Sequence, residues 1–266
     1  MITSSANTRL KEIRKLHDRK NRTESGLAWV EGLRACGDAF IRPDLIRQIV
    51  YCPETLHGDF AEGLIRTAEE NQIENLTVSR DAFLSLSGKD NPQGIGVVIQ
   101  QQMKTIDSVS LIPGDLWIVL DRVADPGNLG TIMRTLDACG GKGLLLIDHC
   151  TDPYDPTAIR ASTGAVFHLD LVRTNRTGFT DWKKNTTAQL VAAVAVAGAL
   201  DYHTFQYGDP LLLMMGSERE GLQPELMDLC ETAVSIPMVG HVDSLNLAEA
   251  TAILLYEIFN QRRDEK

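Results

Sequence analysis

Apolar runs of strand length alternate with amphipathic stretches along the second half of the chain. The runs are rich in leucine, valine and isoleucine, which is typical of strands buried on both faces. Helical spacing of apolar residues marks the stretches between them. The predicted strands are 116–120, 143–147, 190–196, 211–215 and 233–236, and the predicted helices are 131–139, 156–162, 224–230 and 246–259. This alternation predicts an α/β fold with a parallel sheet and helices on both faces.

The first hundred residues show shorter and more mixed patterns. Here we expect a basic helical segment at the N-terminus, helices over 28–40, 62–71 and 81–86, and strands at 46–51, 77–78 and 94–100. The stretch 101–114 is polar, has little periodicity and ends in the turn pair Pro113-Gly114. We therefore predict two domains, a small α/β domain over 1–105 and a larger one over 106–266.

The composition is that of an ordinary globular protein, and 266 residues suffice for two domains. The most apolar stretch, 190–200, is too short to span a bilayer, and the N-terminus lacks a secretory signal. We therefore expect a soluble, cytoplasmic protein with no membrane partner. The five cysteines are scattered without a CxxC pair, so we predict neither a metal site nor a disulfide framework.

The charge is unevenly distributed. The net charge of −10 by itself disfavours nucleic acid as a partner. The first 22 residues, however, carry Glu12 and Asp18 against a larger basic set: Arg9, Lys11, Arg14, Lys15, Arg19, Lys20 and Arg22. Such a basic arm on an acidic body can bind phosphates locally, although a solvated surface helix is the alternative.

Ligands of parallel sheets bind beyond the carboxyl ends of the strands, so the loops there are the candidate site. The loop after the first predicted strand reads DRVADPGNLGTIMRTLDACG. Pro126-Gly127 predicts a turn and Asn128 a helix N-cap, with Arg134 six residues further on. Within one helix this spacing puts two side chains on different faces. A capped helix with a surface arginine is therefore the alternative to a ligand site.

Two further loops follow later strands. One reads Gly216-Ser217-Glu218-Arg219-Glu220-Gly221-Leu222. A glycine at a strand end lets backbone approach a ligand closely. Neither a GxxxxGK[ST] motif nor a GxGxxG motif after a strand occurs, which leaves a nucleoside triphosphate or dinucleotide site unsupported. The other loop, IPMVGHVDSLN, precedes a strongly apolar helix, and Ser244 and Asn246 can both serve as its caps.

Together the three loops resemble the signature of the SpoU family of RNA 2′-O-ribose methyltransferases, within the SPOUT superfamily. The family's N-x5-R motif is matched by Asn128 and Arg134. The G-x-E-x-x-G-L motif is matched by Gly216, Glu218, Gly221 and Leu222, and the I-P-M…S-L-N motif by Ile236, Pro237, Met238, Ser244, Leu245 and Asn246. All three occur in the family's order and spacing, and the resemblance extends over 116–259.

The first hundred residues resemble, more weakly, the substrate-binding domain similar to ribosomal protein L30e that is often fused to this family. The phrases WVEGLRACGDAF and GKDNPQGIGVVIQ carry this likeness. One departure follows the third motif, where Glu249 stands at a position that is usually small or apolar. This departure affects the packing of the last helix and a dimer contact, and it leaves the site residues unchanged.

The resemblance implies a trefoil-knotted sheet, a homodimer whose site the second subunit completes, and S-adenosylmethionine as cofactor. The implied cofactor contacts are Gly216, Ile236, Leu245, Val194, Ala195, Met238 and Asn246. The implied catalytic residues are Arg134, Asn128, Glu218, Ser244 and Asn246. Because an arginine stays protonated, it cannot act as a base. We therefore expect Arg134 to stabilise or orient the developing ribose alkoxide, held by a bidentate pair with Glu218.

A 2′-hydroxyl restricts the substrate to RNA. The basic arm and the additional domain favour a structured RNA as the substrate. We expect ribosomal RNA, and transfer RNA remains the alternative. One alternative is a non-catalytic RNA-binding protein that keeps the fold, which the full set of site residues disfavours. A methyltransferase acting on a base or a protein is a second alternative, and the N-x5-R pairing disfavours it.

Overall fold

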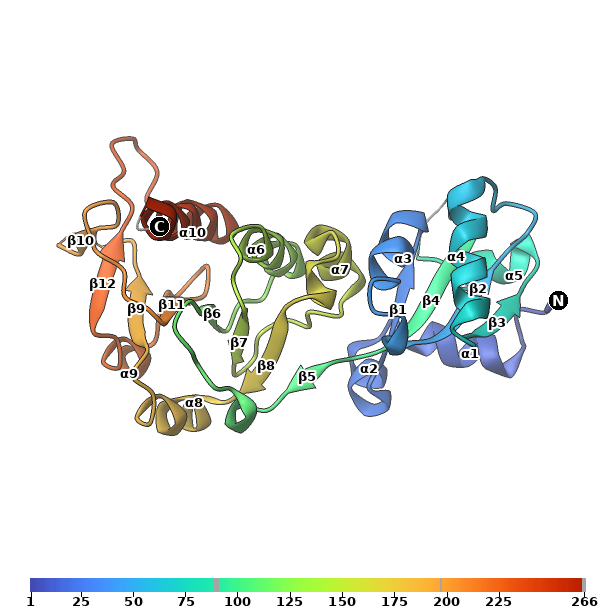
Figure 1. Cartoon of the computed structure of the whole chain (residues 1–266), viewed down its shortest axis with the longest axis horizontal. Helices are drawn as coiled ribbons and strands as arrows, with labels where there is room; N and C mark the ends of the chain where they lie inside the picture. The colour runs from blue at the N-terminus through green and yellow to red at the C-terminus, as the bar shows by residue number, and fades with distance from the viewer. Residues whose placement is uncertain (89–90, 197, 265–266) are drawn as a thin grey trace. The chain divides into compact units, whose positions relative to one another are not determined.

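The computed structural model describes residues 1–88, 91–196 and 198–264, which group into two units (Figure 1). The first unit comprises Met1–Gln101 and Asp152–Phe167, and the second comprises Gln102–Thr151 and His168–Lys266. Lys89 and Asp90, in the phrase GKDNPQGIGVVIQ, lie outside the described residues. In the sequence, Asp152–Phe167 interrupts the second unit, yet it packs with the first.

The first unit is built on a sheet that, within the described residues, has the strand order β1-β4-β2-β3. Strand β4 pairs antiparallel with β1 and β2, and β2 pairs parallel with β3. The strands are β1 (Leu27–Glu31), β2 (Ile46–Tyr51), β3 (Glu74–Thr77) and β4 (Ile95–Gln100). The helices are α1 (Thr8–Lys15), α2 (Arg19–Ser25), α3 (Leu33–Ala39), α4 (Asp59–Glu70), α5 (Arg80–Leu84) and α7 (Pro156–Ser162), with 3-10 turns at Pro43–Leu45 and Ala165–Phe167. Apolar residues of α1 and α5 form one core cluster with Trp29, Val50 and Val98.

The helix predicted over 28–40 is wrong in its first part, because a strand occupies 27–31. Gly26 and Gly32 flank this strand with φ of +67° and +106°, values that side-chain-bearing residues rarely adopt. Every residue of β1 pairs with β4, from Leu27 opposite Gln100 to Glu31 opposite Gly96. Pairing with a strand distant in sequence therefore overrides the local helical pattern.

The second unit holds a sheet that, in the described part of the chain, has eight strands in the order β10-β12-β9-β11-β6-β7-β8-β5. All neighbouring pairs are parallel. The strands are β5 (Met103–Lys104), β6 (Leu116–Asp121), β7 (Gly143–Ile147), β8 (Asp170–Thr174), β9 (Gln189–Ala193), β10 (Leu200–Asp201), β11 (Leu211–Met215) and β12 (Thr232–Ser235). The predicted parallel sheet is confirmed, whereas β5, β8 and β10 were not predicted.

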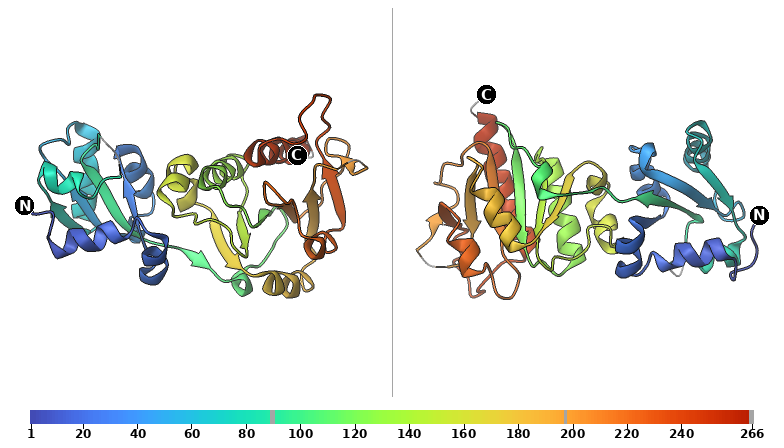
Figure 2. Two further views of the ribbon diagram at one scale, coloured as in Figure 1. Left: turned by 180° about the vertical axis from the view of Figure 1, so that it is seen from behind. Right: turned by 90° about the horizontal axis from the view of Figure 1, so that it is seen from below.

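Helices cover both faces of this sheet, as predicted. Helices α6 (Pro126–Ala138) and α10 (Leu247–Asp264) lie side by side on one face, and α8 (Arg176–Lys183) and α9 (Pro224–Met227) lie on the other (Figure 2). A 3-10 turn at Ile106–Ser108 lies between β5 and β6. Phe179 of α8 and Leu226 of α9 pack in one core cluster with Trp117, Leu145 and Met214 of the strands. No helix of the described residues is long and apolar enough to cross a membrane.

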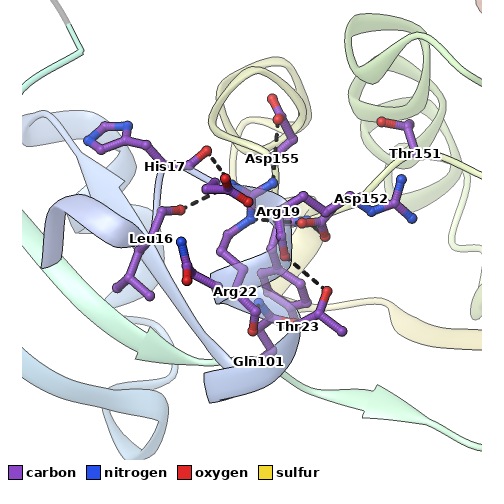
Figure 3. A network of polar contacts seen from close by, with 12 residues as sticks. Leu16, His17, Arg19, Arg22, Thr23, Gln101, Thr151, Asp152 and Asp155 are labelled. Atoms are coloured by element: carbon purple, nitrogen blue, oxygen red, sulfur yellow. Dashed lines mark hydrogen bonds and ion pairs between the residues drawn. The ribbon is translucent and has the colours of Figure 1, made fainter. Parts of the chain in front are cut away.

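A buried ion pair binds Asp152–Phe167 to the rest of the first unit (Figure 3). The Arg22 Nε atom donates to Asp152 Oδ2 at 2.7 Å, and an Nη atom lies 3.5 Å from Asp155 Oδ2. Its other Nη atom donates to the carbonyls of Leu16 and His17. The Arg22 side chain is only 2% exposed. The basic arm predicted to bind phosphates therefore does not include Arg22, whose guanidinium is held inside the protein.

Candidate active site

Two of the three predicted loops, after β11 and β12, line one cavity of about 730 Å³ beyond the carboxyl ends of the central strands. Its walls come from the segments after β9, β11 and β12 and from the start of α10. Every residue predicted to contact the cofactor lines this cavity: Gly216, Ile236, Leu245, Val194, Ala195, Met238 and Asn246. Glu218 and Ser244 line it too. Leu222 of the second motif and apolar residues not predicted from the sequence complete the walls: Met215, Met227, Val234, Leu247, Ala250 and Leu254.

Side-chain hydrogen bonds join the three loops. Asn246 Nδ2 donates to Asn128 Oδ1 at 3.1 Å, and Asn128 Nδ2 donates to Glu218 Oε1 at 3.0 Å. Asn246 Oδ1 accepts from the backbone N–H of Ala248 at 2.8 Å, so this residue also caps α10, as predicted. Each of the three motifs thus contributes one member to a single hydrogen-bonded series.

Asn128 is not the N-cap of its helix, and that prediction is wrong. Helix α6 begins at Pro126, and Asp125 is its N-cap, accepting from the backbone N–H of Asn128 at 2.7 Å. Proline is favoured in the first helical turn because it has no N–H to satisfy there. Since Asp125 satisfies this end of the helix, the Asn128 side chain is left to contact Glu218 and Asn246.

Arg134 lies apart from this series. Both Arg134 and Asn128 belong to α6, and six residues turn a helix by about 240°, so their side chains point to different sides. The Arg134 side chain is exposed and forms no hydrogen bond or ion pair with any other residue that the structure describes. The predicted pairing of Glu218 with Arg134 is wrong within this chain, because the partner of Glu218 is Asn128.

The 216–222 loop folds back on its own start. Ser217 and Gly221 exchange two backbone hydrogen bonds, of 3.2 and 3.0 Å, and Gly221 has φ of +66°. A Cβ atom added to Gly216 would lie 2.3 Å from the Gly221 carbonyl carbon and 2.4 Å from the Leu222 nitrogen. Glycine is required at 216 because the chain's own backbone lies against it, whereas the prediction placed a ligand there.

An ionic network behind this loop was not predicted from the sequence. Arg122, directly after β6, donates from Nη1 to Glu220 Oε2 at 2.6 Å and from Nε to the Asp121 carboxylate at 3.3 Å. The Asp121 residue is fully buried. Burial raises the pKa of its carboxyl group, and the Arg122 charge opposes that rise. The adjacent charged pair Asp121-Arg122 at the end of an apolar strand was the signal that could have revealed it.

The cavity therefore combines apolar walls with a polar rim of amide, hydroxyl and carboxylate groups. Such a site can hold a largely apolar organic ligand and orient it through a few polar contacts. Among the described residues, no group of three or more His, Cys, Asp and Glu side chains could hold a metal ion.

Comparison with known proteins identifies the family. Residues 115–256 match the SpoU rRNA Methylase family, and residues 7–96 match the MRM3-like substrate binding domain. The chain is 33% identical to a 23S rRNA (uridine(2479)-2′-O)-methyltransferase of Streptomyces viridochromogenes, over 93% of this chain and 87% of that protein. The chain belongs to the SpoU rRNA methylase family. The resemblance seen in its motifs is thereby confirmed.

Further similarities cover the whole chain. A 23S rRNA (guanosine(2553)-2′-O)-methyltransferase of Bacillus subtilis is 28% identical over 97% of this chain and 98% of its own length. The crystal structure of an AdoMet-bound rRNA methyltransferase from Sinorhizobium meliloti has a TM-score of 0.87 at 34% identity, covering 99% of this chain and 97% of that one. The predicted fold class of this SpoU methylase is confirmed, including the smaller α/β unit before the parallel sheet.

Proposed function

We propose that this protein transfers the methyl group of S-adenosylmethionine to a ribose 2′-hydroxyl of ribosomal RNA. The observation that carries the proposal is the series Asn246–Asn128–Glu218, which joins one residue of each motif at the rim of the cavity. The names of the two relatives, both 23S rRNA 2′-O-methyltransferases, favour ribosomal RNA over transfer RNA. Binding of RNA alone would require neither this cavity nor this set of polar residues.

We assign the cavity of about 730 Å³ to S-adenosylmethionine. Its volume lies in the range of cofactor pockets, and its apolar walls, including Leu245, Met227 and Leu254, suit the adenine ring. The loops at 194–196 and 216–222 form much of the remaining wall, and we expect their main-chain groups to recognise the cofactor. When bound, this cofactor supplies the electrophilic methyl group.

Asn128 is the residue placed to orient the ribose hydroxyl. Its Oδ1 atom accepts from Asn246 and its Nδ2 atom donates to Glu218, so the orientation of its amide is fixed from both sides. A rigid amide positions a reacting group without reorganising during the reaction. Ser244 adds a hydroxyl group to the same wall.

We assign Arg134 to the active site of a second subunit. Its exposed side chain points away from Asn128 on α6, and it has no partner among the described residues of its own chain. Exposed Ile253 and Tyr256 on the neighbouring helix α10 would be covered in a homodimer. In that dimer the Arg134 guanidinium would stabilise the developing alkoxide of the substrate bound by its partner. We extend the proposal to the family's trefoil knot and to a cytoplasmic location.

Mixed dimers test this arrangement. We expect Asn128→Ala and Arg134→Ala to abolish transfer of labelled methyl groups from S-adenosylmethionine to ribosomal RNA of cells lacking the protein. A dimer with one subunit of each variant keeps one site with both residues intact if Arg134 acts across the interface. Co-expression of the two variants should therefore restore activity, whereas continued inactivity would place Arg134 in the site of its own subunit. Cofactor binding without methylation of any RNA would favour the non-catalytic alternative.

A further inference from the structure

We propose that Arg122 is a positioning residue that holds the 216–222 loop in the conformation that forms the cofactor cavity. The inference rests on the assignment of this cavity under the proposed function. Arg122 follows β6, and the loop follows the neighbouring parallel strand β11, in a register that places Leu120 opposite Met215. The two segments therefore leave the sheet side by side at the same edge.

The Arg122 guanidinium contacts the loop and the residue that follows it. Nη1 donates to Glu220 Oε2 at 2.6 Å, and Nη2 lies 3.5 Å from the Gly221 carbonyl oxygen, to which it also donates. Gln223, with its amide oxygen turned toward the guanidinium, accepts from both Nη atoms at 3.2 and 2.6 Å. One planar group with several fixed N–H donors thus contacts two residues of the loop and the residue that follows it.

The same guanidinium also anchors the loop to the end of β6. Its Nε atom lies 3.3 Å from each oxygen of Asp121, which is fully buried. A buried carboxylate requires a partner, since its charge is otherwise poorly solvated. The backbone of Gln223 hydrogen-bonds to Asp121 as well. The contacts of Arg122 therefore connect the loop to the buried Asp121 at the end of β6.

The backbone of Arg122 has an unusual conformation. Its φ of +55° lies in the left-handed region, which is uncommon for residues other than glycine. Such conformations persist where surrounding contacts determine them. Glu218, which accepts from Asn128, is two residues from Glu220 in the same loop. By fixing Glu220, Arg122 also restricts the position of Glu218. Arg122 therefore influences the series Asn246–Asn128–Glu218 without contacting the substrate.

Hydrogen exchange and cofactor binding test the proposal together. Arg122→Gly keeps the backbone conformation and removes every guanidinium contact. We expect the Ser217 and Gly221 amides to exchange about tenfold faster, and S-adenosylmethionine to bind about tenfold more weakly by equilibrium dialysis, as charged hydrogen bonds of this kind are lost. Arg122→Lys should retain part of the slow amide exchange and part of the cofactor affinity. Gln72→Gly is the matched control, because Gln72 has φ of +56° in the first unit and should change neither measurement.

The exchange rates decide the proposal without a ligand. Unchanged exchange at Ser217 and Gly221 in Arg122→Gly would overturn the proposal, whatever the activity of the variant. Failure of the wild-type protein to bind S-adenosylmethionine would instead contradict the proposed function, while the exchange rates would still decide the role of Arg122. If Arg122→Gly does not fold, Glu220→Gln removes one charged contact alone, and we then expect a smaller acceleration at the same amides. Unchanged exchange in this variant would likewise overturn the proposal.

Discussion

Replacing Gly216 with alanine would place a methyl group where the backbone of the 216–222 loop lies. The added Cβ would be 2.3 Å from the Gly221 carbonyl carbon, 2.4 Å from the Leu222 nitrogen and 2.7 Å from the Gly221 oxygen. Carbon contacts settle near 3.5 Å or more, so the backbone must move by about 1 Å. All three contacts are with backbone atoms, so no side-chain rotation relieves them. Since β11 is buried throughout, the loop is the part that we expect to move.

Overpacking of this kind costs about 1–3 kcal/mol. If the loop that forms the cavity wall bears this cost, S-adenosylmethionine should bind about 5- to 150-fold more weakly. Calorimetric titration of the wild type and Gly216→Ala with the cofactor measures the difference. Gly63→Ala is the control, because Gly63 lies in α4 and its added Cβ meets no atom within 4 Å. Wild-type affinity together with an unchanged melting temperature in Gly216→Ala would refute this reasoning.

Three further predictions concern stability. Arg22→Met leaves Asp152 buried without its cation, so we expect a loss of about 3–5 kcal/mol in urea denaturation, and an unchanged midpoint would show that the ion pair is dispensable. Asp125→Ala removes the N-cap of α6 and should cost about 1 kcal/mol, most of which Asp125→Asn should retain; equal melting temperatures for the two variants would contradict the cap. The hydrogen bond with Glu257 raises the pKa of His203 above 6.5. The stability that this ion pair contributes is therefore complete below pH 6.5 and is lost as pH rises through the raised pKa. Melting temperatures across that range should show this small decline in the wild type but not in His203→Gln.

The sequence pattern was sufficient for strands whose residues are all apolar. Strands β6, β7 and β11 are buried along their whole length, and apart from Asp121 at the end of β6 each appears as an uninterrupted apolar run. Strand β8 has the sequence DLVRT and was not predicted. Its Arg173 donates to the carbonyls of Cys150 and Thr151 at 3.1 and 3.0 Å, which satisfies a charged group inside a strand. Such compensation depends on tertiary structure and leaves no periodic signal.

Motif spacing was sufficient to predict which loops meet, but not how their side chains pair. Asn128, Glu218 and Asn246 were predicted to share a site, and the structure joins them directly. Glu218 was predicted to pair with Arg134, whereas its partner is Asn128, which is not needed as the cap of α6. Arg122 was missed because Glu220 lies 98 residues away in the sequence, and neither residue belongs to a motif position.

The most direct test of ribose methylation is alkaline hydrolysis of ribosomal RNA that this protein has methylated with labelled S-adenosylmethionine. Alkali cleaves RNA through attack of the 2′-oxygen on the adjacent phosphate, so a 2′-O-methyl group blocks cleavage at that nucleotide. We predict that the label is recovered in an alkali-resistant dinucleotide, and that Asn128→Ala yields none. Recovery of the label in mononucleotides would mean that a base is methylated and would contradict the proposed function.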